Sequence, residues 1–482
     1  MQSAVDPSAT HAQPLPGPPG LPIVGSIPDL VRKGRFAFIL ESWRRYGDIF
    51  SIPLIRLPVV DQSPWLSHVL AREHAPKELI VTCHPEAADQ ILRRRSDNYP
   101  KGRGYDAVRV LMGDGLVTAT GESWRRERRL LQPAFRRPAI RDFLPTMERC
   151  TADMLATWER RYASGHAFDV YGEMMDLARR IIGLTMFGTD LGPSSSESAQ
   201  AITVALEGMG RRMEGTVALP LSIPTPANRR FQRAIDLLNQ IVFDIIGRAR
   251  DGRLDSDEPN ILQAMLAARD EESGAPMSDR QIRDEVITLY IAGHETTALT
   301  LTWSLDYLAR YPEVRERVEA EIAATVRDSE APTLEELDRM TYTRMVIDEV
   351  LRLRPPAWAL AREAVAEDEL LGRRIPAGAV VMFNIYAIHR HPASWEGDPD
   401  ASDPDRFLPA KVEARHRGAH IPFIVGPRAC IGKIFSIYET LLALARLLAR
   451  YRFEPVDPAP IPFTAVATLR PSGPVMMRIR PR

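Results

Sequence analysis

One cysteine near the C-terminus stands in a setting that suits a metal ligand. The stretch around Cys430 is FIVGPRACIG, Phe423 to Gly432, and it directly precedes the last predicted helix. The unpaired amides and the dipole of a helix N-terminus favour thiolate over thiol, and Arg428 adds a nearby cation. Gly426 keeps bulk away from the sulfur. This is the environment that a soft, anionic iron ligand needs. A lone cysteine of this kind is more often a buried, unreactive thiol, so the stretch alone leaves both interpretations open.

A second stretch with reactive side chains interrupts the longest predicted helix. The apolar run Val286–Ala292 is followed by Gly293-His294-Glu295-Thr296-Thr297, and apolar residues resume at Ala298. A buried helix should not carry four polar residues beside a helix-weakening glycine without compensation. Threonine can also hydrogen-bond backwards and bend a helix. These residues form either a catalytic group or a polar network inside the core.

Helical patterns dominate the segments that must position these two stretches. Ser278–Arg310 predicts a helix of roughly thirty residues, far above the mean of ~11–12, with Ser278 as N-cap and Tyr311-Pro312 as its end. Other predicted helices are Gly34–Tyr46, Pro85–Arg95, Ile140–Trp158, Thr341–Arg354 and about Ile431–Tyr451. Predicted strands are Ile49–Ile52 and Lys77–Cys83, with small strands and an irregular meander in Trp358–Phe407. We expect a mainly α fold with minor β.

Composition narrows the class of protein. The 482 residues are 45% hydrophobic and 26% charged, with a net charge of -1, so no global field attracts nucleic acid or an acidic membrane. The three cysteines (Cys83, Cys150 and Cys430) form no Cys-x-x-Cys pair, which fits a reducing cytosol. We see no signal peptide and no apolar run of the ~18 residues that a membrane span needs. We therefore expect a cytoplasmic protein without a membrane anchor that does not bind nucleic acid.

The chain shows no Gly/Ser linker or repeat that would divide it. We expect a Pro-rich N-terminal segment, residues 1–30, followed by a single domain, residues 31–482. The stretch Pro14–Pro22 is stiff and cannot be helical. It is either a loose tail or a segment packed on the body, because the apolar residues Leu21, Ile23, Val24 and Ile27 lie in or directly after it.

Four motifs in order resemble the cytochrome P450 family. The cysteine stretch matches the family's Phe-x-x-Gly-x-Arg-x-Cys-x-Gly loop at every fixed position. Ala292–Thr297 resembles the oxygen-activating part of its long central helix. Glu349-Val350-Leu351-Arg352 resembles its Glu-x-x-Arg, and Asp403–Phe407 resembles the meander motif whose Arg406 joins Glu349 and Arg352 in a buried network. The resemblance runs from about Pro16 to the C-terminus. It implies the cytochrome P450 fold, with haem b between the long central helix and the cysteine-loop helix.

The resemblance also implies a set of haem contacts. Cys430 would be the axial iron ligand, and Trp124, Arg128, Arg362 and Arg428 would hold the propionates. Three guanidinium groups around two carboxylates make chemical sense, because arginine stays charged and binds carboxylates through two nitrogens. The remaining implied cofactor contacts are Ala292, Phe423 and Gly432.

The implied activity is that of a haem-thiolate monooxygenase. Thiolate ligation favours O–O cleavage, and Glu295 and Thr296 would relay protons to dioxygen, so these two are the expected catalytic residues. One oxygen atom would enter a lipophilic small molecule by hydroxylation or epoxidation, in bacterial secondary metabolism. The expected pocket segments are Lys101–Leu116, Ala205–Leu221, Leu289–Ala292, Trp358–Leu360 and Val466–Leu469. A peroxide-driven haem enzyme and a non-catalytic haem sensor remain as alternatives.

Electrons must reach the haem from a separate protein, because no flavin or iron–sulfur domain follows the last helix. We expect a ferredoxin or flavodoxin with its NAD(P)H reductase, bound to a monomer. Its docking site would be a basic cluster of Arg125, Arg126, Arg129, Arg136 and Arg137, with steep salt dependence. The alternative is a merely solvated basic helix.

The chain departs from the family pattern at one place. Between Ile49–Ile52 and the strand that begins at Lys77, about twenty extra residues replace the usual tight hairpin. This insertion leaves the pairing of the two flanking strands open.

Overall fold

The computed structural model describes residues 14–54, 78–162, 165–190, 197–214, 220–255, 258–270, 272–326 and 331–482. The helices are α1 (Ile27–Lys33), α2 (Arg35–Tyr46), α5 (Pro85–Asp89), α6 (Asp106–Met112), α7 (Gly121–Leu131), α8 (Arg137–Arg161), α9 (Val170–Phe187), α10 (Glu197–Glu214), α11 (Pro226–Arg250), α12 (Ile261–Ala267), α13 (Asp279–Arg310), α14 (Pro312–Thr325), α15 (Leu334–Arg339), α16 (Thr341–Leu353), α17 (Ile385–Ile388), α18 (Pro409–Ala414) and α19 (Lys433–Arg450).

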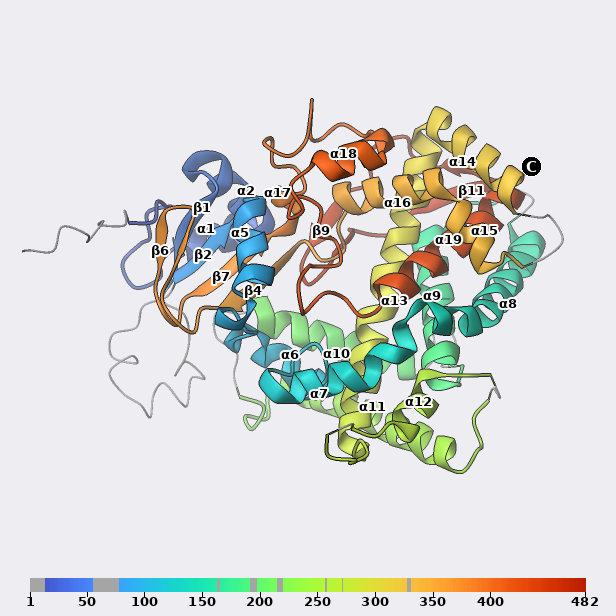
Figure 1. Cartoon of the computed structure of the whole chain (residues 1–482), viewed down its shortest axis with the longest axis horizontal. Coiled ribbons are helices and arrows are strands. Elements are labelled where there is room, and N and C mark those ends of the chain that lie inside the picture. The colour runs from blue at the N-terminus through green and yellow to red at the C-terminus, as the bar shows by residue number, and fades with distance from the viewer. Residues whose placement is uncertain are drawn as a thin grey trace, which may run out of the picture.

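The strands are few and short. They are β1 (Ile49–Pro53), β2 (Glu78–Thr82), β3 (Phe168–Asp169), β4 (Ala359–Glu363), β5 (Asp368–Leu370), β6 (Arg373–Ile375), β7 (Val380–Asn384), β8 (Tyr451–Pro455), β9 (Phe463–Ala465), β10 (Leu469–Pro471) and β11 (Met476–Pro481). They form a four-stranded sheet in the order β1-β2-β7-β4, a three-stranded sheet β3-β11-β8, and two strand pairs. Figure 1 shows the four-stranded sheet at one end and most helices at the other, so the fold is mainly α with minor β.

Strands β1 and β2 pair although the insertion separates them. Ile49 lies opposite Thr82 and Pro53 opposite Glu78 in an antiparallel register. β2 then pairs in parallel with β7, which fixes it inside the sheet. The open question about this pairing is therefore answered, because sheet partners on both sides decide the register. Residues 55–77, which hold most of the insertion, lie outside the described part of the chain.

The N-terminal segment packs on the body from Pro14 onward. The Ser51 amide donates to the Pro16 carbonyl at 2.8 Å, and a side chain on Gly17 would collide with the Ser51 carbonyl oxygen at 2.0 Å. The packed alternative therefore holds, but not for the reason given by the sequence. Leu21 and Ile23 are 58% and 57% exposed, so backbone pairing along β1 makes the contact instead of apolar burial.

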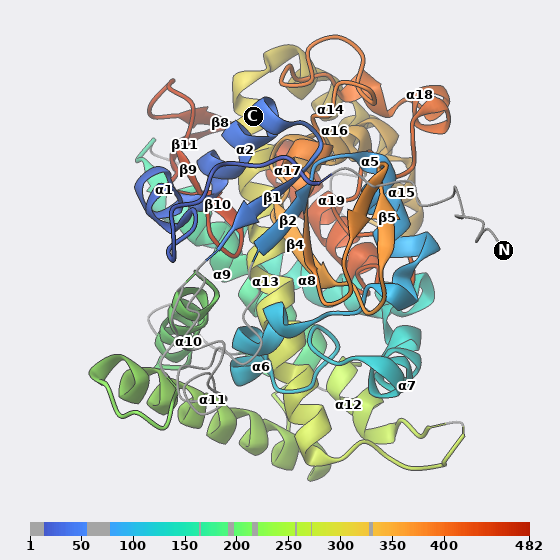
Figure 2. The same cartoon turned by 90° about the vertical axis from the view of Figure 1, so that its left-hand side faces the viewer.

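Helix α13 runs through the middle of the molecule. Ser278 and Gln281 form a capping box at its start: the Ser278 hydroxyl accepts from the Gln281 amide, and the Gln281 side chain accepts from the Ser278 amide. The helix ends at Tyr311-Pro312, as the sequence predicts. It packs against α9, α11, α16 and α19, and Figure 2 shows it behind the four-stranded sheet.

Candidate active site at the cysteine loop and the central helix

The cysteine loop is held by its own backbone. The Cys430 amide donates to the Phe423 carbonyl at 2.9 Å, and the Ala429 amide donates to the Gly426 carbonyl at 3.0 Å. Gly426 has φ +80°, and a β-carbon there would lie 2.0 Å from the Leu92 carbonyl oxygen. Only glycine fits both the backbone angle and this contact. The glycine of the motif is therefore required by the close packing of the loop against Leu92, and this packing helps to position the loop that carries Cys430.

Cys430 differs from the other two cysteines, because it is exposed while Cys83 and Cys150 are buried. Desolvation raises the pKa of the Cys430 thiol, while amide hydrogen bonds from Gly432 and Lys433 and the charges of Arg128 and Lys433 oppose the rise. The net direction is upward, so the helix N-terminus does not by itself make a thiolate here. A metal ion bound at the sulfur would favour the thiolate.

One side of α13 is open. Between Ile282 and Leu308 every residue is buried except Ala292, Gly293 and Thr296. Ala292 and Thr296 are four residues apart and share a helix face, and the Thr296 hydroxyl donates to the Ala292 carbonyl at 2.8 Å. An exposed patch in the middle of a buried helix indicates that this face borders an open space inside the protein.

Gly293 has a packing role. A β-carbon there would lie 2.7 Å from the Ile182 side chain of α9, so the missing side chain lets α9 approach α13 closely. The expected backward hydrogen bonding is present along the helix, and α13 remains one continuous helix from Asp279 to Arg310.

Thr297 ties the open part of α13 to the cysteine-loop helix. Its hydroxyl lies 3.2 Å from the Ser436 hydroxyl of α19. Because α19 starts three residues after Cys430, this contact fixes the central helix against the cysteine loop.

Glu295 points elsewhere than Thr296. Its carboxylate accepts a hydrogen bond from the Thr468 hydroxyl at 3.0 Å and lies 3.7 Å from the Arg470 guanidinium. Thr468 directly precedes β10 and Arg470 lies within it, and both are far from α13 in sequence. The two expected catalytic residues are therefore neighbours in the chain with separate surroundings.

A cluster of cations lies next to the cysteine loop. The Arg428 guanidinium stacks 3.9 Å from the Trp124 ring centroid and donates to the Ala119 carbonyl at 2.7 Å. Arg362 is 4% exposed and donates to the Tyr105 hydroxyl at 3.1 Å. Burial, together with the charge of Arg362, lowers the pKa of Arg428 to about 10.

Lys101 belongs to the same cluster. Its ammonium donates to the Leu116 carbonyl at 3.4 Å. Burial and the charges of Arg362 and Arg428 hold the pKa of Lys101 well below its usual range. Within the described residues none of these three cations forms an ion pair with a carboxylate. Arg362 is buried and the other two cations are partly buried, so the cluster needs a counter-charge and is suited to an anionic group.

Arg128 of α7 contacts the cysteine loop. It donates to the Ala429 carbonyl at 3.0 Å, and its positive charge favours an ionised Cys430.

Comparison with known proteins decides the family. A family model described as Cytochrome P450 matches residues 15–478. The chain belongs to the cytochrome P450 family. It is 34% identical to cyclooctatin synthase of Streptomyces melanosporofaciens over 100% of this chain and 99% of that protein. It is 33% identical to pentalenene oxygenase of Streptomyces avermitilis over 94% of both chains. The crystal structure of the cytochrome P450DA heme domain superposes with a TM-score of 0.84 at 27% identity, covering 98% of both chains.

Family membership makes the chain a cytochrome P450 monooxygenase and implies a haem iron cofactor. The residues described above fit that group. Lys101, Arg362 and Arg428 have no carboxylate partner among the described residues and suit two propionates, and Cys430 presents an exposed sulfur whose ionisation the charge of Arg128 favours. Sequence reasoning placed Lys101 only at the start of an expected pocket segment and not among the cations, because a single lysine outside any motif carries no signal of its surroundings.

The cytochrome P450 also has a buried Glu-x-x-Arg pair. Glu349 and Arg352 are both 0% exposed and are joined by two hydrogen bonds of 2.6 and 2.7 Å. Arg352 also donates to the carbonyls of Pro399 and Ala401 in the meander. Arg406 donates to the Asp398 carbonyl at 2.8 Å, so it binds the same meander backbone and makes no described hydrogen bond to Glu349.

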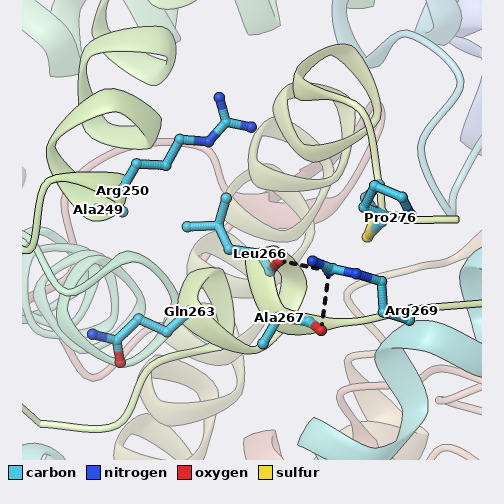
Figure 3. Close-up of a pocket in the computed structure, with 8 residues that line it drawn as sticks. Ala249, Arg250, Gln263, Leu266, Ala267, Arg269 and Pro276 are labelled. Carbon is cyan, nitrogen blue, oxygen red and sulfur yellow. Dashed lines mark hydrogen bonds between the residues drawn. The ribbon is translucent and has the colours of Figure 1, made fainter.

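A pocket lies between the end of α11, α12 and the segment before α13 (Figure 3). It has a volume of about 540 Å3 and is lined by Ala249, Arg250, Gln263, Leu266, Ala267, Arg269, Pro276 and Met277. Arg269 donates to the Leu266 and Ala267 carbonyls, and Arg250 pairs with Asp279. Both arginines are therefore engaged within the protein, and we assign no function to this pocket.

No helix among the described residues is long and apolar enough to cross a membrane.

Proposed function

We propose that this monooxygenase uses Cys430 as the axial ligand of a b-type haem and oxidises a cyclic, terpene-like molecule. One observation carries the site assignment: the single exposed cysteine lies beside Arg128, on a loop fixed against the one open stretch of the central helix. When bound, the haem iron would supply dioxygen activation and oxygen transfer, which amino-acid side chains cannot supply. The chain supplies position, charge and protons.

Trp124, Arg128, Arg362 and Arg428, together with Lys101, would bind the haem carboxylates and the cysteine loop. Phe423 and Gly432 would shape the cysteine loop, since the Phe423 carbonyl accepts from the Cys430 amide and the Gly432 amide donates to the sulfur. Ala292 leaves room on the opposite face of the site, because its small side chain is exposed on α13.

Thr296 and Glu295 would move protons. The Thr296 hydroxyl lies on the open face of α13, where it can pass a proton to a bound reactant. The Glu295 carboxylate accepts from Thr468 and lies beside Arg470. Because Arg470 is 47% exposed, Glu295 lies close to the surface and would take protons from solvent. To deliver a proton towards Thr296, the Glu295 side chain has to rotate away from Thr468.

The substrate class rests on the relatives and on the lining. One relative from Streptomyces melanosporofaciens, 35% identical over 79% of this chain, is a cyclooctat-9-en-7-ol 5-monooxygenase, and another is the pentalenene oxygenase. The expected pocket segments contain apolar side chains such as Leu116 and Leu289, which are buried. Residues 215–219 of one such segment lie outside the described part of the chain.

The first experiment is the carbon monoxide difference spectrum of the dithionite-reduced protein. We expect the long-wavelength Soret band of a thiolate-ligated haem, and its loss in Cys430→His with haem retained. A wild-type protein that binds haem without this band would overturn the assignment of Cys430. Cyclic terpene hydrocarbons should then shift the ferric spin state at lower concentration than linear fatty acids; the reverse order would exclude the proposed substrate class.

We further propose that a separate ferredoxin or flavodoxin, with its NAD(P)H reductase, supplies electrons at the basic cluster. Four of the five arginines are paired within the protein: Arg125 with Glu122, Arg126 with Asp270, Arg129 with Glu272 and Arg137 with Asp338. Arg136 forms no ion pair with any described residue. It therefore contributes most of the cluster's free charge.

Reduction by an acidic donor should slow several-fold in Arg136→Glu and lose most of its salt dependence. Arg480→Glu is the control, because Arg480 lies on β11, which Figure 2 shows on the opposite side of the molecule from α7. Equal reduction rates in the two variants would rule out docking at Arg136.

A further inference from the structure

Two buried glutamates join α7 to α13. Glu127 is 2% exposed and Glu285 is 0% exposed, and their side chains are hydrogen-bonded to each other. Glu127 Oε2 and Glu285 Oε1 receive no N–H or O–H donor from any other described group. Two carboxylates in contact away from water cannot both be ionised. The contact therefore needs a proton between the two groups.

The charges around the pair favour this proton. The pKa of Glu127 is raised to about 7, chiefly by desolvation and also by the charges of Asp114 and Asp284, while hydrogen bonds with Ser123 and Glu285 oppose the rise. Desolvation and Glu127 also raise the pKa of Glu285. Asp284 is itself paired with Arg283 at 2.7 Å.

The positive groups that sense the pair are Lys101 and Arg428. Lys101 interacts electrostatically with Glu285, and Arg428 with Glu127. Neither forms an ion pair with the glutamates, so the proton remains the main source of neutralisation.

The pair also holds a chain segment on the central helix. Glu285 Oε2 accepts from the Leu116 amide at 3.2 Å, and Asp284 Oδ2 accepts from the Asp114 amide at 3.0 Å. Gly113 and Gly115 allow this approach. A β-carbon on Gly113 would lie 2.2 Å from the Asp284 carboxyl group, and one on Gly115 would lie 2.3 Å from the Thr288 hydroxyl. The segment Gly113–Ala119 is thus pressed onto α13 and held there by two acidic side chains.

The same segment holds two cations of the cluster beside the cysteine loop. Lys101 donates to the carbonyls of Leu116 and Val117, and Arg428 donates to the carbonyl of Ala119. Any displacement of the segment from α13 must therefore move the acceptors of Lys101 and Arg428.

We propose that Glu127 and Glu285 are positioning residues that share one proton, hold Gly113–Ala119 on α13 and thereby place Lys101 and Arg428 for the haem propionates. The last step rests on the proposed function, while the shared proton and the held segment do not. When the segment moves away from α13, the two glutamates reach water and their pKa values return to the ordinary ~4.3. Opening then releases one proton at any pH between about 5 and 7.

Hydrogen–deuterium exchange of peptides covering Gly113–Ala119 in the haem-loaded protein tests the first two steps. After correction for intrinsic exchange, protection should fall about tenfold per pH unit between about pH 5 and 7, because opening releases one proton. Glu127→Gln should remove this slope, since its amide can donate to Glu285 without a shared proton. Glu285→Gln should also remove it from the other side of the contact. Glu122→Gln, an exposed change on the same helix, should keep it.

A flat wild-type profile would overturn the shared proton, and so would an unchanged slope in both glutamine variants. The last step is tested by the rate of haem transfer to apomyoglobin. If haem leaves while Gly113–Ala119 is open, the rate of haem loss should follow the open population and rise about tenfold per pH unit between pH 5 and 7 in the wild type, and stay flat in Glu127→Gln. Sloped exchange with flat haem loss would remove Lys101 and Arg428 from the proposal. A protein without a thiolate-ligated haem would refute the proposed function and leave the exchange result standing.

Discussion

The buried pair of Glu349 and Arg352 allows the sharpest test of what holds the fold around the meander. Both side chains are fully buried, and Arg352 has every strong partner inside the protein: two carboxylate oxygens of Glu349 and the carbonyls of His389, Pro399 and Ala401. Glu349→Gln keeps the size and an acceptor but removes the counter-charge. Arg352 then becomes an uncompensated cation where no water can reach it.

The expected cost is about 3–5 kcal/mol, the usual range for breaking a buried ion pair from one side. Unfolding entropy of roughly 2.1 cal/mol/K per residue over 482 residues gives about 1 kcal/mol/K if the chain unfolds as one unit. The melting temperature of Glu349→Gln should therefore fall by about 3–5 °C.

Differential scanning calorimetry on the haem-loaded protein measures this shift. Glu367→Gln is the matched control, because Glu367 forms an equally short ion pair with Arg374 on the surface, and its loss should leave the melting temperature unchanged. Arg352→Lys should also destabilise, since lysine keeps the charge but cannot reach all of these acceptors. If Glu349→Gln melts within 1 °C of the wild type, the buried charge is neutralised in some other way and the reasoning fails.

Three further outcomes are expected. Thr296→Ala should keep haem binding but lower the product formed per NAD(P)H consumed; unchanged coupling would contradict its role in proton delivery. Gly426→Ala should lower haem content on purification, because the new methyl group meets the Leu92 carbonyl at φ +80°, and normal content would contradict this. Chiefly through His391, the pKa of Asp48 is lowered to about 2. Its contribution to stability is therefore present above about pH 4 and lost as pH falls towards 2. Asp48→Asn should flatten melting temperature against pH in that interval; an unchanged profile would contradict it.

Long, strongly patterned elements could be predicted from the sequence. Helix α13 begins at its Ser278 cap and ends at Tyr311-Pro312, as predicted, because capping and proline act within a few residues. The last helix begins at Lys433 instead of about Ile431, since Gly432 serves as its N-cap. The family followed from motif spacing, which is likewise a local property.

The surroundings of each reactive group could not be predicted in this way. Glu295 and Thr296 are adjacent in sequence. Glu295 nevertheless contacts Thr468 and Arg470 at β10, whereas Thr296 lies on the open face of α13. The expected basic cluster is largely neutralised by acids on other segments, such as Asp270 and Asp338.

The sequence by itself determined which reactive side chains are present, which residues form the long helices and which family the chain belongs to. Only the tertiary structure decided which of these groups meet. Lys101 lies with the cations beside the cysteine loop. Glu127 contacts Glu285, although the two residues are more than 150 positions apart in the sequence. The physical reason is that charge state and hydrogen bonding depend on burial and on neighbours, and both are set by packing between segments that carry no trace of each other in the local pattern.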